Sequence, residues 1–343
     1  MKKTAIVILN WNGKDFLEKF LPPLFAHTPE NQADIYVADN NSADNSIDFL
    51  KNNFPAVQII QLAENYGFAG GYNRALEQVD AEYFVLLNND IEVAESWLQP
   101  IIEYLDNHSD TAAAQPKILS YAQKKQFEYA GAAGGFIDKW GFPFCRGRIF
   151  GTVEQDNNQY DNELEIFWAT GACLVIRSAD FWTASGFDED FFAHQEEIDL
   201  CWRLRSSGRK IACIPQSVVY HVGGGTLTVE SPRKTYLNFR NNLLLLYKNL
   251  PENRLRKVMF ARWFFDYLAA FQMFISGKSA NAKQIFKARH DFCKIKKRFS
   301  QKRKENLEKT VLTEIPEMLP QSIVFQYYIK GKKYFNKLNS LFL

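Results

Sequence analysis

The chain has 343 residues, a formal net charge of +2, and 46% hydrophobic against 23% charged residues. This composition is that of an ordered globular protein with a sizeable core. It excludes a disordered chain, and the small net charge argues against a nucleic-acid-binding protein. The charge is uneven, since residues 278–304 hold eleven Lys or Arg against the acid Asp291. We expect a basic segment that follows a more acidic body.

The cysteines and the apolar segments indicate the redox environment of the protein and whether it crosses a membrane. The five cysteines are odd in number and widely spaced, which favours reduced, mostly buried thiols in a cytosolic protein over a disulfide framework or a zinc cluster. The N-terminus has about six apolar residues after its two lysines, too few for a secretory signal. The apolar run over 262–278 is broken by Asp266 and leaves eleven uncharged residues, short of the ~20 that span a bilayer. No transmembrane helix is expected.

The first 120 residues alternate short apolar runs with amphipathic segments of helix length, which predicts a mostly parallel sheet built from βαβ units. Right-handed crossovers place the loops after the strands at one sheet edge, where open α/β sheets bind ligands. Strands are expected at Thr4 to Leu9, Ile35 to Ala38, Val57 to Leu62 and Tyr83 to Leu87. Helices are expected at about Lys14 to Phe25, Asp44 to Asn53, Ala69 to Gln78 and Glu95 to Asn107.

The loops after these strands hold most of the unusual polar residues, namely Asn10 to Asn12, Asp39 to Ser42, and Asn88 to Asp90. Asp90 ends a strand so apolar that we expect the acid to be buried. There it either shapes the turn or binds a divalent cation, because a cation that bridges a diphosphate needs only one or two protein carboxylates.

After residue 120 the predicted secondary structure changes twice. Residues 126–161 are expected to form long loops, before regular structure returns at Phe167 to Ile176. Beyond about Pro232, the segments Leu243 to Tyr247 and Arg254 to Ile275 indicate an amphipathic helix pair that leads into the basic stretch. This region either lies on an anionic membrane leaflet or packs on the main domain or another subunit.

One segment between these regions brings further candidate groups together. Glu196 and Glu197 open an apparent helix, where they interact with the helix N-terminus or one of them serves as a general base. Asp199 lies four residues before Arg203 and is expected to pair with it. His221 ends a strand before a run of glycines. It is either structural or a metal ligand, and an imidazole ligand favours Mn²⁺ over Mg²⁺.

The chain resembles family 2 glycosyltransferases of the GT-A fold, particularly the bacterial rhamnosyltransferase-like branch, in six blocks that occur in the same order: VILNWNG, VADNNS, ENYGFAGGYNRA, LLNNDIEV, TGACLVIRS, and GFDEDFFAHQEEIDLCWRLRSSG followed by VYHVGGGT. The resemblance covers roughly residues 4–245. It implies an α/β domain over residues 1–245, with a mostly parallel, Rossmann-like nucleotide-binding sheet, and a helical, basic C-terminal extension over residues 246–343.

By matching position, the resemblance implies that Asp39 recognises the base or ribose of the nucleotide. Asp90 matches the metal-binding acid of the family's Asp-x-Asp motif, whose first Asp is here Asn88, and His221 matches a histidine that helps to hold the metal and diphosphate. Further nucleotide contacts are expected from Asn10, Asn12, Asn65, Asn73, Asn89 and Arg240. Substrate contacts are expected from Trp168, Gly171, Ala172 and Trp202. A structural role for Arg240 and core positions for the two tryptophans stay open.

Glu197 matches the Asp of the family's Glu-Asp catalytic pair, with Glu196 as the preceding acid. The resemblance implies inversion by direct displacement, in which Glu197 removes the proton of the acceptor hydroxyl while Mn²⁺ or Mg²⁺ stabilises the departing nucleoside diphosphate. Gly67, Gly70 and Gly71 do not follow the G-x-G-x-x-G spacing, so a dehydrogenase is disfavoured and a close-packed loop beside the donor sugar is expected.

We therefore expect a cytoplasmic enzyme that moves a sugar from dTDP-rhamnose or a UDP-hexose to a cell-surface glycan or a lipid-linked acceptor. Membrane contact would place it on the inner face of the cell membrane, and an oligomer is left open. Two alternatives also remain: a non-catalytic protein that binds nucleotide sugars, and a sugar nucleotidyltransferase.

Overall fold

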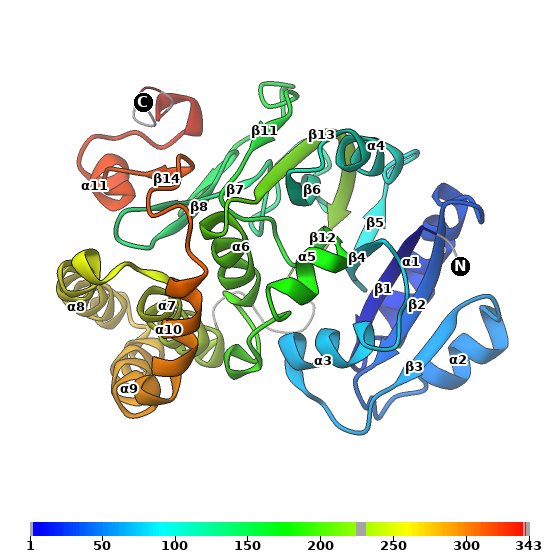
Figure 1. The fold of residues 1–343 in the computed structure, drawn as a ribbon, viewed down its shortest axis with the longest axis horizontal. Helices are drawn as coiled ribbons and strands as arrows, with labels where there is room; N and C mark the ends of the chain where they lie inside the picture. Colours follow the sequence, from blue (N-terminus) through cyan, green and yellow to red (C-terminus); the bar gives the residue numbers. More distant parts are fainter. Residues whose placement is uncertain (1–2, 224–230, 339, 341–343) are drawn as a thin grey trace.

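The computed structural model describes residues 3–223, 231–338 and 340. A central sheet carries helices on both faces, and further helices stand at one end of it (Figure 1). All eight elements predicted in the first 107 residues are confirmed, with ends within four residues of the predicted ones. They are β1 Thr4–Asn10, α1 Lys14–His27, β2 Ala33–Asp39, α2 Ser46–Asn53, β3 Gln58–Gln61, α3 Gly67–Leu76, β4 Tyr83–Asn88 and α4 Gln99–Asn107.

The main sheet has the strand order β11-β13-β6-β12-β4-β1-β2-β3, and β5 (Ile91–Val93) pairs with β13. Strands β1 to β4 are mutually parallel, so their carboxyl ends meet at one edge. β12 (Cys173–Arg177) lies antiparallel between β4 and β6 (Thr111–Ser120), while β13 (Lys210–His221) runs parallel to β6. β11 (Leu164–Glu165) is the antiparallel edge strand. The start of β12 and the end of β13 thereby reach the same edge as the end of β4.

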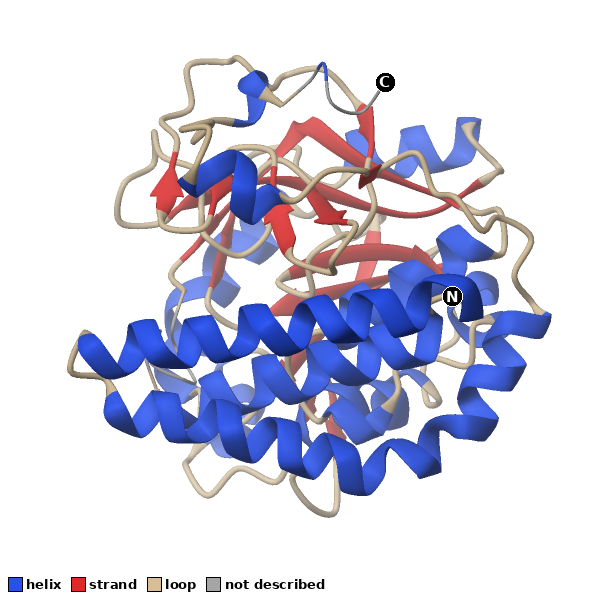
Figure 2. Cartoon of the chain, turned by 90° about the vertical axis from the view of Figure 1, so that its left-hand side faces the viewer, coloured by secondary structure: helices blue, strands red, loops and turns tan. Residues whose placement is uncertain are grey.

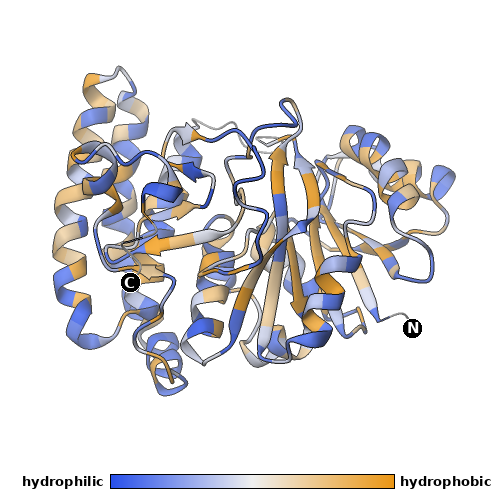
Figure 3. Ribbon diagram, turned by 90° about the horizontal axis from the view of Figure 1, so that it is seen from above, coloured by the Kyte–Doolittle hydropathy of each residue, from blue (hydrophilic) through white to orange (hydrophobic). Residues whose placement is uncertain are grey.

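Both faces of the sheet are covered, which explains why its strands are almost continuously apolar (Figure 3). Leu17 and Leu21 of α1 and Ile101 of α4 pack on one face. On the other face, α3, α6 (Glu196–Ser206) and the C-terminal helices share a second cluster. Four cysteine thiols are free and buried and Cys293 is exposed, as expected for reduced, mostly buried thiols.

The prediction of long loops over residues 126–161 is wrong in one respect, because this segment forms most of a second, five-stranded sheet. Its strands are β7 Gly135–Asp138, β8 Pro143–Cys145, β9 Arg148–Ile149, β10 Thr152–Val153 and, from the C-terminal region, β14 Met318–Leu319. Strands of two to four residues are too short to show an alternating pattern in the sequence. The apolar run predicted from Phe167 becomes a strand only at Cys173.

The C-terminal region is helical as predicted, and its long helices lie across the front of Figure 2. They are α7 Pro232–Asn249, α8 Glu252–Ile275, α9 Ser279–Ile295 and α10 Ser300–Glu308. Shorter helices of the C-terminal region are η2 Lys296–Phe299, α11 Ile323–Tyr328 and η3 Phe335–Lys337, and those before it are α5 Ser178–Thr183 and η1 Glu189–Phe191. The expected boundary at residue 245 falls inside α7, whose Leu243 to Leu246 are fully buried in the same core as the sheet. The helices and the sheet therefore share apolar packing.

The basic segment lies only partly on the surface. Arg289 donates to the buried Asp266 at 2.5 Å, and Lys302 donates to Asp188 at 2.6 Å. Arg303 donates to two carbonyl oxygens at the C-terminal end of α7. These three cations fix α9 and α10 to the rest of the protein, so they are not available to an external partner.

Helix α8 differs from the sequence expectation. Its length and composition match those of a membrane-spanning helix, with 22% of its apolar window buried. The sequence excluded a span because Asp266 interrupts the apolar run, yet this side chain is fully buried and leaves the exposed side uninterrupted. One such helix is weak evidence for a span, because core helices of soluble proteins meet the same criteria.

Candidate functional site

Polar side chains form a hydrogen-bonded group at the carboxyl ends of β1, β2 and β4. Asn10 Nδ2 donates to Asp39 Oδ1 at 3.3 Å, and Asn89 Nδ2 donates to Asn10 Oδ1 at 2.9 Å. The other oxygen of Asp39 accepts from the backbone nitrogen of Ser42 at 2.9 Å. The parallel register that pairs Asn10 with Asp39 brings these loops together. The structure thus places three of the predicted nucleotide-binding residues side by side.

Asn12 and Asn65 shape the loops around this group. Asn12 Oδ1 accepts from the backbone nitrogen of Ala43 at 2.7 Å, and Asn65 Oδ1 accepts from that of Gly67 at 2.9 Å. Gly67 has a φ of 71°, and a Cβ there would lie 2.6 Å from the ring of Phe192. The turn before α3 is therefore close-packed against the loop that precedes α6.

Asp90 and His221 lie beside each other at the turn between β4 and β5. The antiparallel pairing of β13 with β5 puts His221 opposite Ile91, so its Nε2 lies 3.1 Å from Asp90 Oδ1. On the other side of the ring, Nδ1 lies 3.4 Å from Glu128 Oε2. All three polar side chains are buried. Glu128 comes from the segment after β6 and was not among the predicted site residues.

The charges of this group favour a bound cation. Burial lowers the pKa of His221, but its contacts with Asp90 and Glu128 outweigh burial and raise the pKa to about 10. A divalent cation held by Asp90 Oδ1 and His221 Nε2 can replace that proton, and mixed carboxylate and imidazole ligands suit Mn²⁺. The residues present therefore fit the expected metal.

Glu128 lies on the opposite side of the His221 ring from Asp90. Its Oε2 lies 3.4 Å from Nδ1, on the side of the ring away from Nε2, so we expect Glu128 to orient the imidazole rather than to bind the ion that Nε2 binds. Within the described ranges, no three His, Cys, Asp or Glu side chains are arranged to hold one metal ion. A cation at Asp90 and His221 thus needs further oxygen ligands from a diphosphate and water.

Glu196 and Glu197 begin α6, and the Oε2 atom of each is buried. Neither of these oxygens has a hydrogen-bond partner among the residues that the structure describes. A buried, unpartnered carboxylate oxygen is costly to a fold, so its presence indicates a group shaped for a ligand rather than for stability.

Gly171 and Ala172 connect these acids to the edge of the sheet. A side chain on Gly171 would meet Glu197 Cβ at 3.8 Å. The backbone nitrogen of Asn88 donates to the carbonyl of Ala172 at 2.9 Å. Glu197 therefore lies at the same edge of the sheet as the turn that carries Asp90.

Burial changes the proton affinity of both acids. It raises the pKa of Glu197 to about 7. Burial and the nearby charge of Glu197 raise the pKa of Glu196 well above its ordinary value. Adjacent acids of this kind titrate as a pair. A carboxyl group with a pKa near neutral pH is well matched to general-base catalysis.

The loop before α6 has an unusual backbone and is held by α7. Its positive φ angles occur at Phe192 (65°), His194 (69°) and Gln195 (75°), a conformation that costs about 1–3 kcal/mol per non-glycine residue. Asn241 Nδ2 donates to the carbonyl oxygens of Phe191 (2.9 Å), Ala193 (2.9 Å) and His194 (2.7 Å). Asn241 thus fixes the loop that leads directly into Glu196 and Glu197, a role that no sequence pattern indicated.

Arg240 and Asn242 extend this contact between α7 and the loop. Arg240 Nη2 donates to the carbonyls of Asp190 and Phe191, both at 3.0 Å. Asn242 Nδ2 donates to Gln195 Oε1 at 3.1 Å. These contacts support the structural alternative for Arg240 rather than the predicted contact with the diphosphate.

Replacing Asn241 by Leu is expected to destabilise the protein by about 1–3 kcal/mol and to lower kcat, because the buried carbonyls lose their donor and the loop relaxes. Urea unfolding and steady-state kinetics measure both effects. Asn53→Leu is the matched control, since Asn53 makes an exposed hydrogen bond to Phe49. Equal stability and kcat for the Asn241→Leu variant and its control would show that α7 does not hold the loop.

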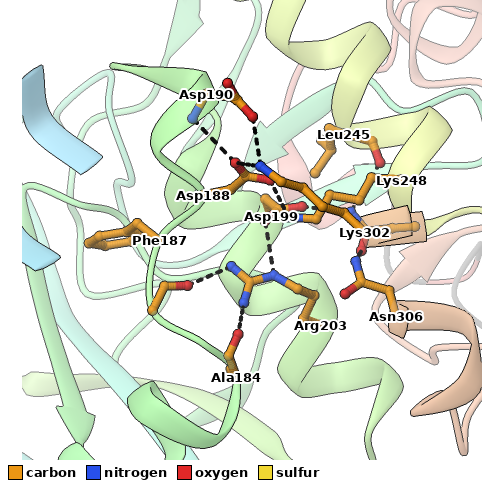
Figure 4. Close-up of polar contacts among 12 residues, drawn as sticks. Ala184, Phe187, Asp188, Asp190, Asp199, Arg203, Leu245, Lys248, Lys302 and Asn306 are labelled. Atoms are coloured by element: carbon orange, nitrogen blue, oxygen red, sulfur yellow. Dashed lines mark hydrogen bonds and ion pairs between the residues drawn. The ribbon is translucent and has the colours of Figure 1, made fainter. Parts of the chain in front are cut away.

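A buried network of charges fixes the other side of α6 (Figure 4). Asp199 accepts from Arg203 at 2.9 Å and from Lys248 at 2.8 Å, which confirms the predicted pairing with Arg203. Lys248 also donates to Asp188 at 2.7 Å. Although burial opposes ionisation, Lys248 and Lys302 lower the pKa of Asp188 to about 2. Asp199 therefore has a structural role that its two glutamate neighbours do not share.

Three further predicted residues are engaged with the protein itself. Asn73 donates to the carbonyl of Phe187 and accepts from its backbone nitrogen, both at 2.9 Å. Trp168 donates to the carbonyl of Phe136 at 2.9 Å, and both Trp168 and Trp202 are buried in the core. These contacts support structural roles in place of the predicted nucleotide contact of Asn73 and the predicted sugar stacking of the two indoles.

Comparisons with known proteins indicate the class of protein to which the fold belongs. The structure is similar to that of GalNAc-T7 with UDP, GalNAc and Mn²⁺, with a TM-score of 0.58 and 14% identity over 83% of this chain and 54% of that chain. The fold is thus that of GT-A glycosyltransferases, and this chain spans about half the length of that relative. Residues 5–150 match the model of glycosyl transferase family 2.

Two proteins with similar sequences are named as rhamnosyltransferases. N-acetylglucosaminyl-diphospho-decaprenol L-rhamnosyltransferase of Mycobacterium tuberculosis is 24% identical over 232 residues, which are 63% of this chain and 75% of that protein. Rhamnosyltransferase WbbL of Escherichia coli is 23% identical over 223 residues, which are 63% of this chain and 82% of that protein. The matched family model and both of these relatives are named as glycosyltransferases.

Proposed function

We propose that this protein is a metal-dependent, inverting glycosyltransferase that moves a sugar from dTDP-rhamnose or a UDP-hexose to a cell-surface glycan or a lipid-linked acceptor. The observation that carries the proposal is the pair of acids Glu196 and Glu197, each with a buried and unpartnered carboxylate oxygen, at the same sheet edge as Asp90 and His221. A base for the acceptor and a charged site for the leaving group are the two elements that direct displacement requires.

The donor binds at the carboxyl ends of β1 and β2 in this proposal. Asp39 accepts hydrogen bonds from the base or ribose, and Asn10 and Asn89 orient that carboxylate and the loop beside it. Asp90 and His221 would hold the divalent cation. When bound, the cation supplies positive charge that stabilises the departing nucleoside diphosphate.

Glu197 removes the proton from the acceptor hydroxyl as that oxygen attacks the anomeric carbon. Its pKa of about 7 leaves a substantial fraction ionised at neutral pH and still gives a strong base. Burial and the charge of Glu197 raise the pKa of Glu196, so Glu196 keeps its proton to higher pH and the two adjacent acids need not be charged together. Direct attack opposite the leaving group inverts the anomeric centre.

Donor and acceptor are inferred from the relatives. The two rhamnosyltransferases support dTDP-rhamnose as the first donor to test, and the decaprenol-linked substrate in the name of the mycobacterial relative supports a lipid-linked acceptor. A lipid-linked acceptor places the enzyme in the cytoplasm at the inner face of the cell membrane.

A thermal-shift screen of nucleoside-diphosphate sugars, with Mn²⁺ and with EDTA, tests donor binding. We expect dTDP-rhamnose or a UDP-hexose to raise the Tm in the presence of Mn²⁺, since ligand at 100 times its Kd stabilises a protein by about 2.7 kcal/mol. NAD is the control ligand and is expected to leave the Tm unchanged. A shift with NAD and none with any nucleotide sugar would contradict the proposal.

A further inference from the structure

Helix α8 presents a continuous apolar face to solvent. Seven large side chains on it are between 50% and 75% exposed: Phe260, Trp263, Phe264, Leu268, Phe271, Phe274 and Ile275. Their spacing of three and four residues places them along one side of the helix. Contiguous exposed apolar surface of this extent marks an interaction site in a soluble protein.

The exposed face is uninterrupted because the two charged residues in this part of α8 lie on the buried side of the helix. Arg262 and Asp266 lie four residues apart on the buried side of α8, with Arg262 Nη2 donating to Asp266 Oδ1 at 2.8 Å. Asp266 also accepts from Arg289 of α9, and Arg262 donates to Asn242 of α7. Between Lys257 and Lys278 no exposed residue of α8 carries a charge.

The same face continues onto α9. Phe286 is 53% exposed, and its ring lies 5.2 Å from that of Tyr267 between the ring centroids. Exposed basic side chains accompany the apolar surface, Arg256 and Lys257 at the N-terminal end of α8 and Lys283 and Lys287 beside Phe286 in α9.

The acids of these two helices are all engaged elsewhere. Glu252 pairs with Arg303, Asp266 is buried, and Asp291 accepts from Tyr236. The border of the apolar face is therefore positively charged, which is complementary to anionic lipid head groups and unlike a protein interface, where Lys is depleted.

We propose that the exposed face of α8, together with Phe286 of α9, binds the surface of an anionic phospholipid bilayer, with the helix lying parallel to the membrane plane. Aromatic side chains enter the boundary between head groups and acyl chains, while the flanking Lys and Arg contact phosphates. Leu255, Val258 and Ala270 remain packed on the protein. A helix that crossed the bilayer would have to break this packing and the buried Arg262–Asp266 pair. Only the link to a lipid-linked acceptor rests on the proposed function.

Vesicle flotation of the full chain tests this surface. Wild-type protein is expected to float with vesicles of phosphatidylcholine and phosphatidylglycerol, and more weakly with phosphatidylcholine alone. The triple variant F260S/F264S/F271S is expected to bind at least about tenfold more weakly, since each replacement removes an aromatic group that enters the membrane. Val311→Ser, at a residue that is 74% exposed outside α8 and α9, is the matched control and should bind as wild type does.

Two further measurements separate the possible outcomes. Transfer to a water-soluble acceptor analogue is expected to be equal in the wild type and the triple variant, so loss of vesicle binding with retained transfer supports the surface independently of the transfer chemistry. Equal flotation of the wild type and the triple variant would overturn the proposal. It would also be overturned if the wild type failed to bind vesicles but formed a dimer in light scattering that the triple variant abolished, because the face would then join two copies of the chain.

Discussion

Replacing Glu197 by Gln is expected to lower kcat for sugar transfer by about 10²–10⁴-fold, because the amide cannot remove the proton of the acceptor hydroxyl. Binding of the nucleotide sugar is expected to persist, since Glu197 acts on the acceptor and not on the nucleotide. Steady-state kinetics and donor titration by calorimetry separate the two effects. Glu196→Gln is the matched comparison and is expected to have the smaller effect on kcat.

The Glu197→Gln variant is also expected to change the pH dependence of the protein's stability. Burial raises the pKa of Glu197 in the folded protein from 4.5 to about 7, so the folded state binds more protons than the unfolded state between these values. Stability from this group is present below about pH 4.5 and is lost as the pH rises to 7. The variant should therefore melt above the wild type at pH 8 and close to it at pH 4.5. A wild-type kcat in the variant, or a lower melting temperature at pH 8, would argue against this role.

Replacing Asp90 by Asn is expected to lower kcat/KM by about 10²–10³-fold, the usual effect of losing one group that stabilises transition-state charge. Mn²⁺ affinity, measured by electron paramagnetic resonance without any substrate turnover, should fall with it. His221→Gln is expected to act in the same direction, because His221 Nε2 lies 3.1 Å from Asp90 Oδ1.

Glu128→Gln distinguishes a ligand from a residue that orients a ligand. Glu128 faces Nδ1 of His221 and not Nε2, so its loss is expected to weaken Mn²⁺ binding by only about 10–100-fold. Mn²⁺ affinity unchanged by Asp90→Asn, or retained transfer in that variant with EDTA, would contradict a metal site at this turn.

The sequence predicted the main sheet because its strands combine apolar runs with helix-length spacers. The same pattern located the polar loops at the ends of β1, β2 and β4, where Asn10, Asp39 and Asn89 now lie together. Parallel strands make this inference possible, because every strand end is followed by a loop at the same edge.

Other parts of the site were not predictable from local patterns. Glu128 lies in a segment of short strands without periodicity, and it reaches His221 only through the pairing of β6 with β13. Asn241 is one polar residue in a helix, and its role depends on the loop carbonyls that it meets. The inward orientation of Asp266 follows from the packing of α8 on α9, so the sequence made this acid look like an interruption of an apolar surface.

Inverting sugar transfer is tested most directly by an analysis of the products formed from dTDP-rhamnose or a UDP-hexose, Mn²⁺ and a polyprenyl-diphosphate-linked glycan. We expect one nucleoside diphosphate to be released for each glycoside formed, with the anomeric configuration of the donor sugar inverted. Release of pyrophosphate instead would identify a nucleotidyltransferase. Donor binding without any product would indicate a protein that only binds nucleotide sugars, and either result would contradict inverting sugar transfer.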